Sequence, residues 1–132
     1  MINQDDNKGS VARVLVVEDD VVSRLLLNEI LKEMGLSITF ARNGQEAVNQ
    51  VISEGDTIDF ILMDLKMPIL NGFEATTAIR ELGFVKPIIA QTAYASKEDQ
   101  EKVSSGGFDA YISKPVKKDL LLDILKQLNV LR

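Results

Sequence analysis

The segment IDFILMDLKMPILNGFEATTAIREL, residues 58–82, contains the two patterns that decide the fold of this chain. Its first part, residues 58–63, is a short, nearly continuous apolar run, which is typical of a strand buried on both faces of a parallel sheet. Its second part, residues 73–82, places apolar residues at helical spacing and is followed by Gly83, a common helix-ending residue. Between them, Gly72 is expected to adopt a positive φ in a turn.

The same alternation of patterns fills the rest of the chain. Four further apolar runs lie at residues 11–17, 37–41, 87–92 and 110–113. Four further helical patterns lie at residues 22–34, 45–53, 96–104 and 117–131. Strict alternation of strand and helix predicts right-handed crossovers, and hence an α/β fold with a doubly wound five-stranded parallel sheet and helices on both faces. The polar residues 1–10 predict a flexible lead-in, which leaves one domain over residues 11–132.

The composition excludes several classes of function. With 15 basic and 20 acidic residues and a net charge of -5, the chain is not expected to bind nucleic acid or an acidic membrane surface. No apolar run approaches the roughly 20 residues of a membrane span, and the expected location is the cytoplasm. The sequence has no cysteine and no histidine, so any chemistry must use carboxylates, hydroxyls and lysine.

Polar side chains follow four of the predicted strands, at the edge of the sheet where such folds bind ligands. These residues are Glu18, Asp19 and Asp20 after the first strand, Asp64 after the third, Thr92 at the end of the fourth and Lys114 after the fifth. Clustered carboxylates repel one another, so we expect a hard divalent cation here, Mg²⁺ or else Mn²⁺ or Ca²⁺. Asp64 is a competent nucleophile toward a phosphoryl group, while Thr92 and Lys114 can contact phosphoryl oxygens. Asp20 taken alone is a helix cap or a loop acid.

Four motifs in order carry a resemblance to a known family. They are VLVVEDDVVSR at residues 14–24, MDLKMPILNGFEA at 63–75, QTAYA at 91–95 and YISKP at 111–115. Together they resemble the receiver domain of two-component response regulators, most of all the receivers attached to hybrid histidine kinases. The resemblance runs from about residue 11 to the end, which makes residues 11–132 the expected receiver domain. It implies a flavodoxin-like sheet with strand order 2-1-3-4-5.

The resemblance also implies roles for the residues at the strand ends. Asp64 accepts a phosphoryl group from a partner's phosphohistidine, and Lys114 and Thr92 contact that group. The cofactor is Mg²⁺, with Mn²⁺ possible. Its ligands are Asp19 and Asp64 directly, Glu18 through water, and the backbone carbonyl of Lys66. The domain is then no enzyme in the usual sense, but a phosphoacceptor that assists its own phosphorylation and dephosphorylation.

Two pairs of residues are expected to control the phosphorylated state. Phosphorylation draws the switch residue Thr92 inward and lets Tyr111 rotate into the space left behind. Lys66 and Tyr94, two residues past the acceptor and two past the switch hydroxyl, flank the path of an attacking water. Neither side chain is a base near pH 7 and both are bulky, so we expect slow loss of the phosphoryl group.

The first predicted helix has more apolar residues than its core-facing stripe needs. The surplus residues lie beside the acidic edge and are Val21, Val22, Leu25 and Leu26. Scattered surface leucines are ordinary, but a cluster of this kind favours a docking patch. The expected partner is a histidine kinase or a histidine phosphotransfer domain. The sequence leaves open the cognate kinase, the output, the oligomeric state, and whether this receiver stands alone or comes from a hybrid kinase.

Three other functions are open to a fold of this kind. A flavin-binding electron carrier would need a glycine- and hydroxyl-rich loop after the first strand, where Glu18 and Asp19 stand instead. A phosphohydrolase with an aspartate nucleophile would need an acid two residues later, where Lys66 stands. A phosphate-independent interaction module of the same fold is disfavoured because no site residue is missing.

Overall fold

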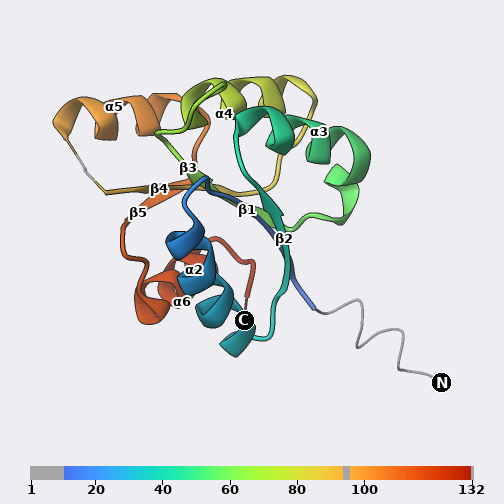
Figure 1. Cartoon of the computed structure of the whole chain (residues 1–132), viewed down its shortest axis with the longest axis vertical. Helices are drawn as coiled ribbons and strands as arrows, with labels where there is room; N and C mark the ends of the chain where they lie inside the picture. Colours follow the sequence, from blue (N-terminus) through green and yellow to red (C-terminus); the bar gives the residue numbers. More distant parts are fainter. Residues whose placement is uncertain (1–10, 94–95, 132) are drawn as a thin grey trace.

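The computed structural model describes residues 11–93 and 96–131 of the chain (Figure 1). The predicted lead-in at residues 1–10 and the predicted lifetime residue Tyr94 lie outside the described residues. Strands and helices alternate along the described chain. In order, they are β1 Arg13–Val17, α2 Val21–Glu33, β2 Ser37–Ala41, α3 Gly44–Glu54, the 3₁₀ turn η1 Gly55–Thr57, β3 Phe60–Asp64, α4 Gly72–Glu81, β4 Ile88–Thr92, α5 Lys97–Ser105, β5 Ala110–Ser113 and α6 Lys118–Gln127.

The strands form one parallel sheet of five, in the order β2-β1-β3-β4-β5. Helices α2 and α6 cover one face, and α3, α4 and α5 cover the other (Figure 1). The predicted doubly wound α/β fold and its strand order are therefore confirmed. Among the described residues, no helix combines the length and the apolar character needed to cross a membrane.

The sheet is buried on both faces because its central strands carry apolar residues in succession. All five residues of β3 and of β4 are buried. Along β1, Val14 and Val16 pack with Leu27 and Leu31 of α2, whereas Leu15 and Val17 pack with the helices of the opposite face. This double burial explains why the strands appear in the sequence as continuous apolar runs without alternation.

Both ends of β3 differ from the predicted range for local reasons. The third strand was expected at residues 58–63, but the N–H of Ile58 donates to the Gly55 carbonyl at 3.3 Å and closes η1 instead. The ladder extends further at the other end, where Asp64 pairs in register with Gln91. Asp64 is thus the last residue of β3, and its position is fixed by the sheet.

The last helix is shorter than its apolar pattern predicts. The pattern extends over residues 117–131, but α6 ends at Gln127. Asn129 adopts a left-handed φ of 62°, and the N–H of Val130 donates to the carbonyl of Leu125 at 2.9 Å. This is a common way to end a helix. Val130 and Leu131 still pack against the core, so their apolar spacing continues after the helix has stopped.

Candidate functional site

Two carboxylates are buried side by side where β1 and β3 end. Glu18 follows β1 directly and is fully buried, and Asp64 ends β3 with 5% of its surface exposed. Asp19, the next residue after Glu18, is exposed. Each of the three residues offers a carboxylate oxygen, and these oxygens lie within 4.8 Å of one another. The structure therefore brings together the acids that the sequence placed at one edge of the sheet.

Lys114 carries the positive charge that lies against these acids. Its ammonium group is 2.7 Å from Oε1 of Glu18 and 3.2 Å from Oδ2 of Asp64. The backbone places it there, because the N–H of Lys114 donates to the carbonyl of Thr92 at 2.8 Å as the chain leaves β5. One lysine thus partly neutralises two buried carboxylates from two other strands.

Burial and pairing shift two of these pKa values. Burial raises the pKa of Glu18 above its ordinary value, and the ammonium of Lys114 opposes that rise only in part. Burial works against the charge of Lys114, but its bonds and charge interactions with Glu18 and Asp64 outweigh burial and raise the pKa of Lys114. Both effects indicate an acidic site that is short of positive charge.

Asp20 has a structural role at the same edge. Its side chain accepts a hydrogen bond from the N–H of Ser23 at 2.8 Å and caps α2. This bond lowers the pKa of Asp20. Arg24, one turn into the helix, donates to the backbone carbonyl of Glu18 at 2.8 Å. The start of α2 therefore holds the turn that presents Glu18 and Asp19.

A cavity of about 250 Å³ opens above the acids and gathers the predicted phosphoryl-site residues. Thr92, which is 3% exposed, ends β4 at this cavity. The backbone N–H of Lys66 points back to Oδ1 of Asp64 at a long 3.4 Å. The described residues that line the cavity are Glu18, Asp19, Asp20, Ser23, Asp64, Lys66, Thr92, Ala93 and Lys114. Tyr111 is not one of them; it lies on β5, 39% exposed, with Ala90 as its register partner.

Gly72 supports the loop after Asp64 in a different way from the one predicted. It does not have a positive φ and is instead the first residue of α4. A Cβ at this position would lie 2.2 Å from the backbone carbonyl oxygen of Asp64. Its N–H donates to the carbonyl of Leu65 at 3.1 Å. The requirement for glycine is thus close approach of the helix start to the backbone of the acceptor residue.

The four predicted docking residues form an exposed apolar face on the first half of α2. The exposed fractions are 58% for Val21, 62% for Val22, 62% for Leu25 and 53% for Leu26. The core-facing residues Leu27 and Leu31 are buried, as the helical spacing predicts. Whether a partner binds the exposed face stays a prediction.

Gln91 is a buried polar residue to which the sequence assigned no role. It lies on β4 beside Asp64 of β3, is fully buried, and donates to the carbonyl of Val17 at 3.5 Å. A signal was present in the sequence, because Gln91 interrupts the apolar run that becomes β4. A polar side chain in a strand buried on both faces needs a partner or a function.

The assembled site suits the handling of an oxyanion. It combines a carboxylate held at the end of a strand, two further acids able to take a hard cation, an ammonium and a hydroxyl. Oxygen ligands without histidine or cysteine are those that Mg²⁺ and similar ions prefer. Such a cation would offset the negative charge that otherwise repels a phosphate from Asp64.

Known proteins share both the sequence pattern and the fold. A family model described as the response regulator receiver domain matches residues 14–126. Hybrid signal transduction histidine kinase I of Dictyostelium discoideum is 41% identical over an alignment of 120 residues, and the match covers 86% of this chain and 7% of that kinase. The chain thus spans a small part of this longer relative.

Two similar solved structures are of known receiver domains. One is the receiver domain of sensor histidine kinase PA1611 from Pseudomonas aeruginosa PAO1, which has a magnesium ion in its active site cleft. It is 33% identical with a TM-score of 0.79, and the match covers 90% of this chain and 98% of that one. The second structure is the co-crystal structure of the Saccharomyces cerevisiae histidine phosphotransfer signaling protein Ypd1 with the receiver domain of the response regulator Ssk1. A chain in it is 33% identical to this one with a TM-score of 0.78, and the match covers 88% of this chain and 88% of that one.

Proposed function

Since the chain belongs to the response regulator receiver domain family, we propose that it accepts a phosphoryl group from a partner's phosphohistidine onto Asp64. The observation that carries this proposal is the pairing of Asp64 and Glu18 with Lys114 at the ends of three strands. In the transfer, a carboxylate oxygen of Asp64 attacks phosphorus as the bond to the donor imidazole nitrogen breaks. Lys114 and Thr92 stabilise the charge on the equatorial oxygens.

Incubation with acetyl phosphate tests this function without a partner protein. With Mg²⁺ present, the intact protein should gain the mass of one phosphoryl group. Chelation of divalent cations should prevent that gain. A protein that gains no mass under either condition would favour a phosphate-independent interaction module instead.

A bound Mg²⁺ would supply the positive charge that this acidic site lacks. Glu18, Asp19 and Asp64 fit such an ion, because their carboxylate oxygens already lie within 4.8 Å of one another. The magnesium ion named in the PA1611 receiver structure supports the same choice of ion. We propose that Asp19, Asp64 and the Lys66 carbonyl bind the ion directly and that Glu18 does so through water.

Substitution of Asp19 should remove most of the stabilisation that Mg²⁺ provides. A ligand that binds only the folded state at ten times its Kd adds about 1.4 kcal/mol to the free energy of unfolding. We expect Mg²⁺ to raise the Tm of the unmodified protein by the corresponding amount and that of Asp19→Ala far less. Thermal unfolding with and without Mg²⁺ measures this, with Asp20→Ala as the control that loses a helix cap but keeps its Mg²⁺ response. An equal response in Asp19→Ala would exclude Asp19 as a ligand.

We propose that the output of the domain is a conformational switch between Thr92 and Tyr111. Thr92 is buried at the cavity, and Tyr111 is exposed on the neighbouring strand. Movement of the Thr92 hydroxyl toward a phosphoryl oxygen would leave room for the aromatic ring to turn inward. This would shift an existing equilibrium at the surface formed by α5, β5 and α6.

The exposed apolar face of α2 is the proposed docking surface for a histidine kinase or a histidine phosphotransfer domain. Val21 directly follows the turn that holds Asp19 and Asp20, so a partner seated on this face lies close to the acceptor. The Ypd1 co-crystal structure supports this class of partner, because the chain similar to ours comes from a complex with a histidine phosphotransfer protein.

A charge on the docking surface should slow phosphoryl transfer from a protein donor but not from a small-molecule donor. Leu25→Asp places a carboxylate in the apolar face, and we expect transfer from a phosphorylated histidine phosphotransfer protein to fall about tenfold, the cost of a moderate interface residue. Labelling by acetyl phosphate should not change, because a small donor needs no docking surface. Ile52→Asp is the matched control, since Ile52 is 65% exposed on α3, outside the patch. Equal losses with both donors would indicate damage to the fold.

We also propose that Lys66 and Tyr94 make the phosphorylated state long-lived. Lys66 lines the cavity next to Asp64, where its side chain would lie beside a bound phosphoryl group. A barrier increase of about 1–2 kcal/mol would slow hydrolysis roughly tenfold.

A further inference from the structure

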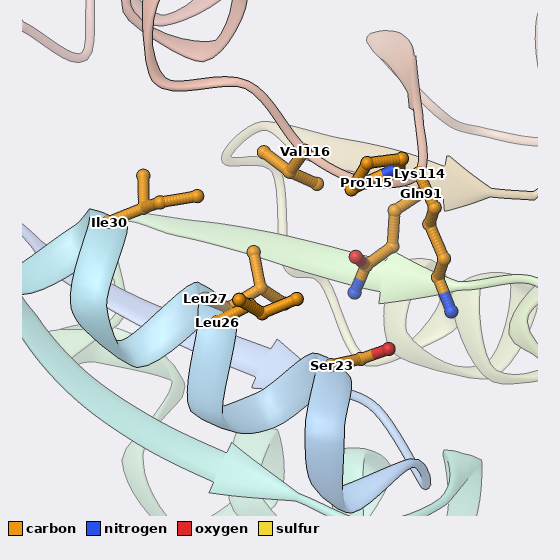
Figure 2. A pocket seen from close by; sticks show the side chains of 8 residues that line it. All are labelled: Ser23, Leu26, Leu27, Ile30, Gln91, Lys114, Pro115 and Val116. Atoms are coloured by element: carbon orange, nitrogen blue, oxygen red, sulfur yellow. The ribbon is translucent and has the colours of Figure 1, made fainter.

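A second cavity lies beneath Lys114, between the first half of α2 and the segment that follows β5 (Figure 2). It has a volume of about 260 Å³. Its walls are largely apolar, and Gln91, Lys114 and Ser23 provide polar groups at one end. The apolar wall consists of Leu26, Leu27, Ile30, Pro115 and Val116. Ser23 and Lys114 also line the phosphoryl-site cavity, so the two cavities are neighbours.

The volume sets the size of a possible occupant. An engineered apolar cavity of about 150 Å³ binds benzene. By proportion, the cavity beneath Lys114 has room for about ten non-hydrogen atoms. Aliphatic walls make water a poor filling except at the polar end, so an occupant with an apolar body fits best.

Gln91 defines the polar contact that an occupant would make. Its side chain is fully buried, and Figure 2 shows its carboxamide directed into the cavity. Its Nε2 donates to the Val17 carbonyl at 3.5 Å, whereas its Oε1 has no hydrogen-bond partner among the described residues. A buried acceptor left without a donor costs about 1–3 kcal/mol. A ligand that brings a donor to this point would recover that cost.

We propose that this cavity is a binding site for a small, largely apolar molecule that donates one hydrogen bond to Oε1 of Gln91. The apolar body of the molecule packs on Leu27, Ile30 and Val116. Its donor end lies at Gln91, next to the aliphatic part of Lys114. A bound molecule would therefore touch the lysine that pairs with the proposed phosphoacceptor.

Indole and benzothiophene are the probes that test this site. The two bicyclic rings have nearly the same shape, but only indole carries an N–H donor. We expect both to shift the methyl NMR signals of Leu26 and Leu27 saturably, with indole binding about fivefold more tightly, as one neutral hydrogen bond predicts. In Gln91→Leu, which keeps the side-chain volume but removes the acceptor, the two affinities should become equal.

A space-filling variant separates this cavity from unspecific binding. Val116→Trp should fill the cavity and weaken indole binding more than tenfold. Val85→Trp, at an 87% exposed position before β4, should leave it unchanged. The proposal is overturned if indole produces no saturable shift at Leu26 and Leu27, or if Val116→Trp binds indole as well as the unmodified protein. Equal affinities of the two rings in the unmodified protein would overturn the role of Gln91.

Discussion

Asp64→Asn is expected to abolish the gain of phosphoryl mass from acetyl phosphate and from a phosphohistidine donor. The amide is a far weaker nucleophile than a carboxylate, and it removes one negative charge from the cation site. The shape of the side chain is nearly unchanged, and Asp64 ends a fully buried strand whose ladder does not depend on its side chain. The fold should therefore survive, and the variant is expected to show no labelling at all by intact-mass spectrometry.

Asp20→Asn is the matched control for the acceptor. Asp20 lies at the same edge of the sheet and caps α2 through Ser23, and asparagine caps a helix as well as aspartate does. We expect Asp20→Asn to take up phosphoryl groups at close to the normal rate. If Asp64→Asn gained the full mass, the acceptor would be another residue, and tryptic mapping of the labelled peptide would identify it.

The sequence predicted the fold, and it predicted which side chains lie together at the candidate site, because both depend on the same pattern. Apolar runs marked the strands, and the first polar residue at the end of each run had to lie at the ligand-binding edge of a parallel sheet. Asp64 follows directly from this rule, and Thr92 is the last residue of its run, one past the buried Gln91. Lys114 lies one residue and Asp19 two residues past their strands, where the short connections leave little freedom. The positions of these residues at the strand ends therefore follow from the strand pattern without any tertiary contact.

Other features depend on contacts that no single segment contains. The positive φ predicted at Gly72 is wrong, and only the packing of α4 on the backbone of Asp64 explains why a side chain is excluded there. Gln91 lies in an apolar run of the sequence. That its Oε1 lacks a hydrogen-bond donor among the described residues is seen only in the folded chain, where α2 and the segment after β5 form a cavity beside it. The pairing of Lys114 with both Glu18 and Asp64 is likewise a property of three strands brought together.

Lys114→Met should reduce both the stability of the protein and its rate of phosphorylation. The variant keeps the length of the side chain but leaves two buried carboxylates without their counter-charge. Breaking a fully buried pair costs 3–5 kcal/mol. Because the Lys114 side chain is 21% exposed and the raised pKa of Glu18 lets that carboxyl take up a proton, we expect a loss of about 2 kcal/mol at pH 7. Loss of the phosphate contact should also slow labelling by acetyl phosphate about 10²-fold, as for the removal of one oxyanion donor.

The pH dependence of this loss distinguishes electrostatics from packing. The pKa of Glu18 is already raised above its ordinary 4.5, and removal of the ammonium that opposes the rise must raise it further. A carboxyl whose pKa is higher in the folded than in the unfolded protein costs no stability at a pH below its unfolded pKa. The cost then grows with pH and is complete once the pH has risen through its folded pKa. The deficit of Lys114→Met should therefore be small near pH 4.5, grow toward pH 7, and be partly restored by Mg²⁺. Urea unfolding at several pH values measures this loss of stability. The control is Lys118→Met, which breaks an exposed ion pair with Glu33 and should cost less than about 0.5 kcal/mol. A deficit that is independent of pH would show that Lys114 acts through packing and not through its charge.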